Sequence, residues 1–359
     1  MKIFATFLPQ FHQIEENDKW WGKGFTEWTN VKKALPLFKK HIQPKHPLNN
    51  NYYNLLDKET VVWQTKLMHE YGIEGFMYYH YYFNGKLIME KPAENLLKWK
   101  EIEQPFFFCW ANHKWVKTKK NVKETLIDME YGNIDVWEKH FSYLLPFFKD
   151  NRYEKNNNCP LFMIFRPLFP EKNKMIEYFD KRCKEEGFNG ICLIESFDGG
   201  DIKLLKNRKS EQTKFFYYRE PTFSQNTFDI EYRTLMSRLA FKIRALGRKC
   251  GLYHKPRIYD GKKLIDLKLK RDFVDDEIIH GICFEWDNTP RHKERGYIIT
   301  PFSENDFQKY MKKIQNDEYF IINAWNEWCE GMMLEPTEEE GYKYLEWIRH
   351  FKEMNNQMR

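Results

Sequence analysis

Eight short apolar segments, rich in aromatic and β-branched residues, alternate along much of the chain with amphipathic stretches, and this alternation constrains the fold most strongly. The candidate strands are Ile3–Phe7, Gly75–Tyr82, Phe106–Ala111, Leu161–Arg166, Gly190–Glu195, Phe215–Tyr218, Gly281–Trp286 and Tyr319–Trp325. The candidate helices are Lys58–Tyr71, Ala93–Lys100, Ile134–Phe148, Lys172–Glu186, Asp229–Leu246, Glu304–Asn316 and Glu338–Met354. Alternating strands and helices predict a parallel α/β sheet. Eight strands favour a (β/α)8 barrel of the TIM type, with elaborated βα loops, over an open doubly wound sheet.

The chain has 359 residues, which is enough for one large domain or for two smaller ones. It contains no internal repeat, no low-complexity linker and no hinge rich in Pro, Gly or Ser. A Gly-x-Gly-x-x-Gly motif is also missing, which weighs against a dinucleotide-binding fold. We therefore expect residues 1–359 to form a single domain.

The net charge is +6, and the positive excess is concentrated in three zones, Lys114–Lys123, Lys203–Lys214 and Lys242–Arg271. Such zones either are solvated faces or attract an anionic glycan, a diphosphate-linked sugar or an acidic membrane surface. The chain has neither zinc-ligand spacing nor a Gly-rich aromatic strand motif, so no nucleic-acid partner is expected.

The seven cysteines are odd in number and none lies at Cys-x-x-Cys spacing, which predicts free thiols in a reducing compartment. The chain opens on a strand-like segment that has no basic leader, and no apolar segment is long enough for a membrane span. These features predict a cytoplasmic protein without a transmembrane segment. They leave peripheral contact with a membrane open.

Polar side chains lie at or just after the carboxyl ends of most candidate strands. They are Gln10, His12, His80, Asn84, Asn112, His113, Arg166, Glu195, Asp198, Asp287, Asn288, Asn326, Glu327 and Glu330. In a (β/α)8 barrel these ends share one rim, which is where such barrels carry their active sites. The pattern therefore predicts a functional site at this rim.

The stretch from Ile321 to Gly331 places two carboxyl groups, Glu327 and Glu330, just beyond the last candidate strand. On a first helical turn, side chains three residues apart lie roughly 5–6 Å from each other. Two carboxyls at that distance repel as anions, so one of them tends to keep a proton. An acid and a base among aromatic residues, which make up 18% of this chain, suit chemistry at a glycosidic bond. The alternative is that both glutamates only stabilise the N-terminus of a helix, where negative charge is favoured.

Several sequence blocks together resemble the WbsX-type proteins of bacterial surface-polysaccharide clusters, which are similar to glycoside hydrolase family 99. The blocks are Phe7-Leu8-Pro9-Gln10-Phe11-His12, Glu16-Asn17-Asp18, Trp20-Trp21-Gly22-Lys23-Gly24-Phe25-Thr26-Glu27-Trp28, Tyr71-Gly72-Ile73-Glu74-Gly75-Phe76, Tyr79-His80-Tyr81, Cys109-Trp110-Ala111-Asn112, Trp286-Asp287-Asn288-Thr289-Pro290-Arg291 and Asn326-Glu327-Trp328-Cys329-Glu330-Gly331. They span residue 3 to about residue 345 in the expected order, so the resemblance covers nearly the whole chain. The tryptophan-rich block and the last block are the most specific.

The resemblance implies a (β/α)8 fold and action at a glycosidic bond inside an oligosaccharide. Family 99 enzymes are retaining endo-acting α-mannosidases or mannanases that use the 2-hydroxyl of the substrate as nucleophile, through a 1,2-anhydro sugar. By motif, Glu327 would be the base that takes the proton of this hydroxyl. Glu330 would be the acid that protonates the leaving oxygen and later activates the incoming water or alcohol.

One departure concerns residue 113. The group usually continues Trp-Ala-Asn with Glu-Asn-Trp, whereas this chain has His113-Lys114-Trp115. A neutral histidine still accepts a hydrogen bond, and a cationic one would favour an anionic sugar or phosphate. The change implies either altered specificity, which we favour because both glutamates of the last block remain, or lost activity.

Fourteen residues in or beside the matching blocks are candidates for substrate binding. They are Gln10, His12, Glu27, Trp28, His80, Trp110, Asn112, His113, Trp286, Asp287, Asn288, Arg291, Trp325 and Asn326. For several of them a structural role is an equal alternative: Glu27 could fix a loop, Asp287 could form an Asx-turn with Arg291 at the surface, and His80 could be a satisfied buried histidine. No His, Asp or Glu constellation has metal spacing, so we expect neither a metal nor another cofactor.

Three functions are consistent with the sequence. The first is an endo-glycosidase or transglycosylase that acts on a surface glycan or oligosaccharide, free or lipid-linked. The second is a WbsX-type glycosyltransferase of O-antigen or capsular polysaccharide assembly, although an Asp-x-Asp motif and a phosphate loop are missing. The third is a catalytically inactive glycan-binding protein.

Overall fold

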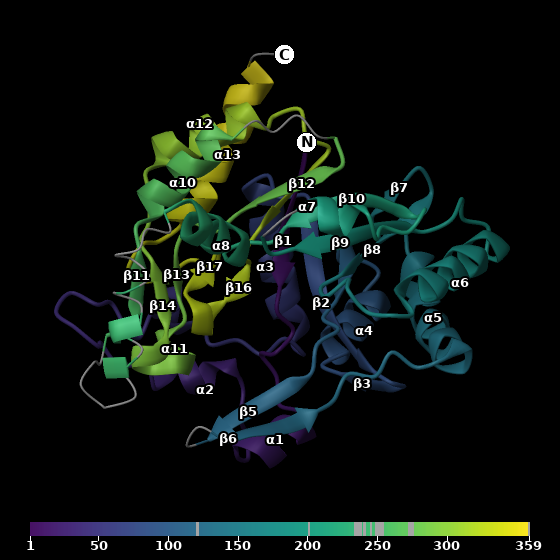
Figure 1. Ribbon diagram of the computed structural model, residues 1–359, viewed down its shortest axis with the longest axis horizontal. Helices are drawn as coiled ribbons and strands as arrows, with labels where there is room; N and C mark the ends of the chain where they lie inside the picture. Colours follow the sequence, from purple (N-terminus) through teal and green to yellow (C-terminus); the bar gives the residue numbers. More distant parts are fainter. Residues whose placement is uncertain are drawn as a thin grey trace.

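Eight parallel strands close into a barrel in the computed structural model (Figure 1), which describes residues 1–119, 122–199, 202–232, 255–271 and 276–357, with 239, 242–244, 246 and 247. In spatial order the strands are β1 (Lys2–Phe7), β2 (Gly75–Phe83), β4 (Phe106–Trp110), β8 (Cys159–Ile164), β9 (Cys192–Phe197), β10 (Thr213–Tyr218), β12 (Ile278–Ile282) and β15 (Tyr319–Ile322). β15 pairs with β1 and closes the ring. The predicted (β/α)8 fold is confirmed.

The barrel strands are buried on both faces, which explains why they appear in the sequence as continuous apolar runs. All five residues of β4 are buried, and Phe7 of β1 stacks on Tyr78 of β2 with ring centroids 4.3 Å apart. Gly75 begins β2 where the chain passes close to its neighbours. A Cβ at this position would lie 2.4 Å from the carbonyl oxygen of Pro105, so only glycine fits.

Helices surround the barrel (Figure 1). They are α3 (Lys58–Glu70), α4 (Lys91–Lys98), α5 (Ile134–Phe148), α6 (Lys172–Glu185), α7 (Ile202–Lys206), α8 (Thr222–Glu231), α10 (Gly261–Lys270), α12 (Glu304–Lys313) and α13 (Lys343–Gln357). α5 shows how sequence dictates placement: Asn133 caps its first turn, and Phe141, Leu144 and Phe148 form one buried stripe. Within the described part of the chain, every helix is too short or too polar to span a bilayer.

Two expected segments differ from the structure. The expected strand Gly281–Trp286 is interrupted: β12 ends at Ile282, and Trp286 lies in the separate strand β13 (Trp286–Asp287), because the chain leaves the barrel there and pairs antiparallel with β14 (Tyr297–Ile299). The expected helix Asp229–Leu246 begins within α8, and much of its remainder lies outside the described residues.

Short elements fill the loops at the carboxyl ends of the strands. They are α1 (Glu15–Trp21), α2 (Glu27–Lys32) and η1 (Leu48–Asn50) after β1; β3 (Lys86–Ile88) after β2; β5 (Trp115–Lys119) and β6 (Val122–Ile127) after β4; β13, α11 (Thr289–His292), η2 (Lys293–Arg295) and β14 after β12; and β16 (Asn326–Glu327), η3 (Trp328–Glu330) and β17 (Met332–Met333) after β15. β7 (Lys155–Asn156) pairs with β8, and β11 (Arg257–Tyr259) pairs with β14. α2 and α11 lie close together at this end of the barrel (Figure 1), and both contact η3.

Candidate active site

Glu327 and Glu330 lie in a tight turn beyond the last barrel strand. Glu327 ends β16, Glu330 ends the 3₁₀ turn η3, and β17 returns antiparallel to β16. Gly331 closes the turn with a φ of 59°, and a Cβ there would lie 3.1 Å from the backbone nitrogen of Asp287. The expected helical turn is a single 3₁₀ turn and does not continue as a helix, because the chain folds back here as a hairpin that passes close to β13.

Arg291 of α11 brings three carboxyl groups together. Its Nη1 donates to Glu330 Oε1 at 3.1 Å. Its Nη2 donates to Glu27 Oε2 at 3.0 Å and lies 3.5 Å from Glu327 Oε2. The second oxygen of Glu330 accepts a hydrogen bond from Trp286 Nε1 at 3.0 Å. Both oxygens of Glu330 therefore face donors, one of them cationic.

Glu327 is in a different environment from Glu330. It is buried, and apart from its 3.5 Å approach to Arg291, its Oε2 has no hydrogen-bond partner within the described residues. Burial raises the pKa of Glu327 to about 8, and the charge of Glu330 adds to the rise while Arg291 opposes it. At neutral pH this shift favours the protonated form of Glu327.

Glu27 reaches the same guanidinium from the other end of the chain. It is the first residue of α2, is 3% exposed, and its backbone carbonyl accepts a hydrogen bond from the thiol of Cys329 at 3.3 Å. Of the two roles considered for Glu27, the geometry favours an ion pair that fixes Arg291. α2 and η3 thereby hold each other in place.

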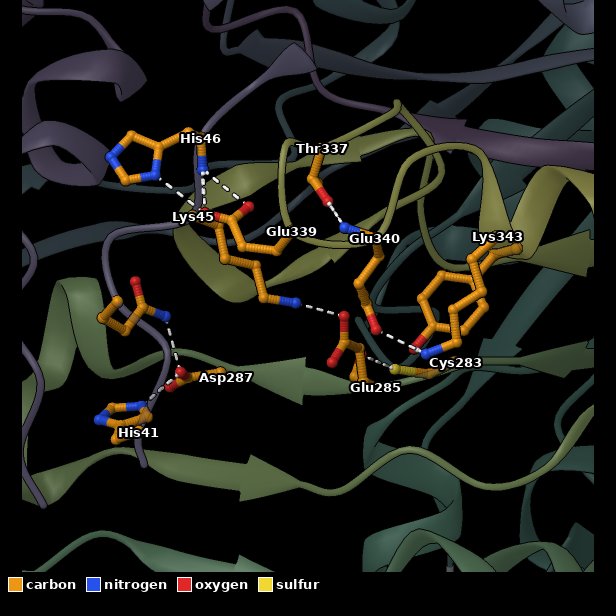
Figure 2. Close-up of polar contacts among 12 residues, drawn as sticks. His41, Lys45, His46, Cys283, Glu285, Asp287, Thr337, Glu339, Glu340 and Lys343 are labelled. Atoms are coloured by element: carbon orange, nitrogen blue, oxygen red, sulfur yellow. Dashed lines mark hydrogen bonds and ion pairs between the residues drawn. The ribbon is translucent and has the colours of Figure 1, made fainter. Parts of the chain in front are cut away.

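Asp287 is anchored from the arm that links α2 to η1, residues 33–47 (Figure 2). His41 Nε2 lies 2.8 Å from Asp287 Oδ2, and Gln43 Nε2 donates to the same oxygen at 2.6 Å. The other oxygen, Oδ1, accepts from the backbone of Thr289 at 3.0 Å, which is the Asx-turn considered as the structural role of Asp287. These contacts fix β13, and β13 carries the Trp286 indole that bonds Glu330.

The arm is itself held by charges. Figure 2 shows Lys45 paired with Glu285, and Glu340 paired with Lys343 at 2.5 Å close by. Lys45 is 8% exposed, so this ion pair is largely removed from water. Sequence reasoning missed the arm, because His41, Gln43 and Lys45 lie in a polar stretch without a motif, about 240 residues from their partners.

Three of the predicted tryptophans lie in the packed interior. Trp28 Nε1 donates to the Tyr53 carbonyl at 2.8 Å, and Trp110 Nε1 donates to the Tyr82 carbonyl at 3.0 Å. Trp325 is fully buried against Phe76, with ring centroids 4.7 Å apart. Trp28, on α2, also packs against Trp328 of the glutamate turn with ring centroids 5.3 Å apart, whereas no described hydrogen bond joins any of the three indoles to Glu327 or Glu330.

The predicted polar residues Asn326, Asn288 and His80 also face protein groups. The amide of Asn326 accepts from Leu8 N at 2.7 Å and donates to Leu8 O at 3.0 Å. Asn288 Oδ1 accepts from the Tyr297 backbone at 2.7 Å. His80 Nε2 lies 2.8 Å from the Nε2 of the buried His140. Their polar atoms hold the fold together.

Four predicted residues lie elsewhere on the rim. The Gln10 carbonyl accepts from the Glu27 backbone at 3.4 Å, and burial lowers the pKa of His12 to about 4. Asn112 accepts from the backbone nitrogen of Arg166 and donates to its carbonyl, both at 2.7 Å. His113 follows Asn112 at the end of β4. None of these four side chains makes a described contact with Glu327 or Glu330.

Burial and the charge of Glu327 together raise the pKa of the Tyr79 and Tyr81 phenols of β2 well above its usual value. Both phenols are therefore close enough to Glu327 to be affected by its charge. They stood within a matching sequence block but were not singled out as site residues. Among the described residues, no three His, Cys, Asp or Glu side chains gather in a way that could hold a metal ion.

Comparison with known proteins places the chain in a family. The sequence model of the glycosyltransferase WbsX family matches residues 3–348. The uncharacterized protein WxcX of Xanthomonas campestris pv. campestris, in strains B100 and ATCC 33913, is 30% identical over 362 residues, covering 97% of this chain and 49% of the relative. The chain thus spans about half the length of these relatives.

Solved structures share the fold. The GH99 endo-alpha-mannosidase from Bacteroides thetaiotaomicron matches with a TM-score of 0.54 and 11% identity, over 99% of this chain and 97% of that one. A glycoside hydrolase-like protein matches with a TM-score of 0.60 and 10% identity, over 98% and 93% of the two chains. At such identities the likeness concerns the barrel alone. Because the family model covers nearly the whole sequence, the chain belongs to the WbsX glycosyltransferase family.

Proposed function

We propose that the protein is a carbohydrate-active enzyme that acts on an internal glycosidic bond of a bacterial surface glycan or oligosaccharide, with Glu327 and Glu330 as its proton carriers. One observation carries the proposal. At the rim of the barrel, one buried carboxyl holds its proton to a pKa of about 8 while its neighbour forms an ion pair with Arg291. A coupled pair that shares one proton is what general acid and base catalysis at neutral pH requires.

The reaction proposed for this pair is the one that the family 99 resemblance implies. The 2-hydroxyl oxygen of the sugar bonds to C1 while one carboxylate takes the hydroxyl proton. The bond from C1 to the leaving oxygen breaks, and the other carboxyl protonates that oxygen. Water or an acceptor alcohol then opens the 1,2-anhydro ring, and both protons return. Neither glutamate bonds to carbon, so their separation has to span only hydrogen-bonding positions.

The order of roles within the pair is a separate question. The resemblance implies that Glu327 is the base and Glu330 the acid, whereas the unliganded protein holds its proton on Glu327. The charges of Glu330 and Arg291 both act on Glu327, so a substrate that displaces Arg291 from Glu330 would change the electrostatic balance around both carboxyls. We retain Glu330 as the acid for the substrate complex.

An activated leaving group separates the two roles. An aryl glycoside of the shortest accepted oligosaccharide, with a dinitrophenyl leaving group, needs little protonation, so the variant that lacks the acid should cleave it while losing the natural glycan. We expect Glu330→Gln to cleave the aryl glycoside but not the natural glycan, whereas Glu327→Gln should cleave neither. The reverse pattern would exchange the assignments, and full activity of both variants on the natural glycan would remove the pair from the mechanism.

A glycosyltransferase is the second candidate, and the family match favours it. The same pair would then activate an acceptor hydroxyl and protonate a departing group. Incubation with the surface glycan of the producing organism alone distinguishes the two: a glycosidase or transglycosylase yields shorter or rearranged chains, whereas a transferase yields product only after an activated sugar is added. Binding without turnover under both conditions would indicate an inactive glycan-binding protein.

A further inference from the structure

A second charged cluster lies at the rim of the barrel, built from the ends of three consecutive strands. Arg166 follows β8, Asp198 follows β9 and Arg219 follows β10. Arg166 Nη1 and Arg219 Nη2 both donate to Asp198 Oδ2, at 2.6 Å and 2.8 Å. The two guanidinium groups therefore converge on one carboxylate oxygen.

An aromatic ring supports this cluster. The guanidinium carbon of Arg219 lies 4.2 Å from the ring centroid of Phe165, and that of Arg166 lies 5.3 Å from it. The ring of His113 packs against the same phenyl group at 5.1 Å. Asn112 bonds the backbone of Arg166 on both sides. The arginines are thus held in place before any ligand arrives.

The cluster faces the same end of the barrel as the glutamate pair. In the strand order, β8 lies opposite β15, β9 lies opposite β1, and β10 is separated from β15 only by β12; all carboxyl ends point the same way. Tyr79 connects the two groups. Its ring contacts Phe165 with centroids 5.9 Å apart, and the pKa of its phenol is raised by burial and by the charge of Glu327 and lowered by the charge of Arg219. A glycan seated at the pair would extend toward these arginines.

The charge of the cluster is not balanced. Two guanidinium groups face one carboxylate, and His113 adds no negative charge. The Arg166 side chain is 51% exposed, and within the described residues it uses only its Nη1 donor, on Asp198. Arginine offers five donors in a planar fork that matches the oxygens of carboxylates and phosphates. Donors and charge therefore remain for an anion.

We propose that Arg166 and Arg219 form a subsite for an anionic group of the glycan, either the carboxylate of an acidic sugar or a phosphate, next to the sugar held at Glu327 and Glu330. The position of the glycan in this inference rests on the proposed function. The binding of an anion by the two arginines does not. It makes Arg166 and Arg219 residues that determine specificity.

Direct binding tests the subsite without requiring turnover. Glucuronate, glucose 1-phosphate and glucose are titrated into the full chain at 0.15 M salt, roughly physiological ionic strength, and binding is followed by ligand-observed NMR. We expect the two acids to bind more tightly than glucose, and whichever acid binds more tightly identifies the anion. Arg166→Gln, which removes charge-assisted bonds, should weaken binding of that acid about tenfold. Arg219→Gln should do the same.

A matched variant makes the result specific. Lys149→Gln removes one positive charge just after α5, where the side chain is 52% exposed and paired with Glu186, so it reproduces the exposure and pairing of Arg166 away from the rim. We expect it to bind the acid as the unmodified protein does. Equal binding of acids and glucose, or equal weakening by Lys149→Gln and Arg166→Gln, would overturn the subsite. Specific anion binding by a chain that turns over no glycan would instead count against the proposed function.

Discussion

Replacing Glu327 with glutamine should make the protein more stable at neutral pH. Burial raises the pKa of Glu327 from 4.5 to about 8, and Glu330 adds to the rise. The unfolded chain releases this proton above pH 4.5, whereas the folded protein keeps it until about pH 8. Between these values the folded state binds more protons, so the stability linked to Glu327 is complete below pH 4.5 and is lost as the pH rises through 8.

The size of the effect follows from proton linkage. Between pH 4.5 and 7, each pH unit lowers the free energy of unfolding by about 1.4 kcal/mol. Relative to its value at low pH, this free energy has fallen by about 3 kcal/mol at pH 7 and by less than about 1 kcal/mol at pH 5. Glutamine has nearly the shape of a neutral carboxyl group and cannot ionise, so Glu327→Gln removes this loss. For a chain of 359 residues, the gain at pH 7 corresponds to a rise of about 4 °C in melting temperature.

Scanning calorimetry at pH 5 and pH 7 measures the effect, and Glu335→Gln is the matched control. Glu335 is also a buried carboxyl with its pKa raised to about 7 by burial, but its oxygens accept from Tyr53, Gln64 and Trp328. An amide nitrogen there would face these donors, so Glu335→Gln should lower the melting temperature. If Glu327→Gln melts no higher than the unmodified protein at pH 7, or gains equally at both pH values, the linkage argument is refuted.

Three further predictions concern single side chains. Glu330→Gln should reduce turnover of the natural glycan at least about 100-fold while leaving the dissociation constant of the glycan nearly unchanged, as compared by product release and direct binding. Asp287→Asn should cost about 1–3 kcal/mol of stability, read from urea unfolding, because His41 and Gln43 converge on one of its oxygens; an unchanged midpoint would contradict the anchoring role. Asn326→Ala should cost a similar amount by the same measurement, whereas a loss of glycan binding at full stability would restore Asn326 as a ligand contact.

The barrel could be predicted from the sequence because most of its strands are buried on both faces and therefore appear as largely apolar runs. The short elements of the rim could not be predicted in this way. β13 and β14 are two and three residues long, and they exist because they pair with each other after the chain has left the barrel. Too few residues take part for any periodicity to appear.

The carboxyl pair could be found from its local motif, but its surroundings could not. Arg291 donates a hydrogen bond to Glu27, which is 264 positions away in the sequence, and His41 contacts Asp287, which is 246 positions away. Asn326, a residue type that suits sugar hydroxyls, turns out to hold Leu8, 318 positions away. Residue type predicts which hydrogen-bond donors and acceptors a side chain offers. Which partner they bond depends on the fold.

The interlock between the two ends of the chain has a consequence for synthesis. Lys45 pairs with Glu285, the Asn326 amide holds Leu8, and Tyr53 donates to Glu335. A nascent chain on the ribosome therefore has no assembled carboxyl cluster until residues beyond 330 have emerged and met β1. Closure of the ring and assembly of the carboxyl cluster therefore coincide in one event, and under the proposed function unfinished copies should be inert toward glycans.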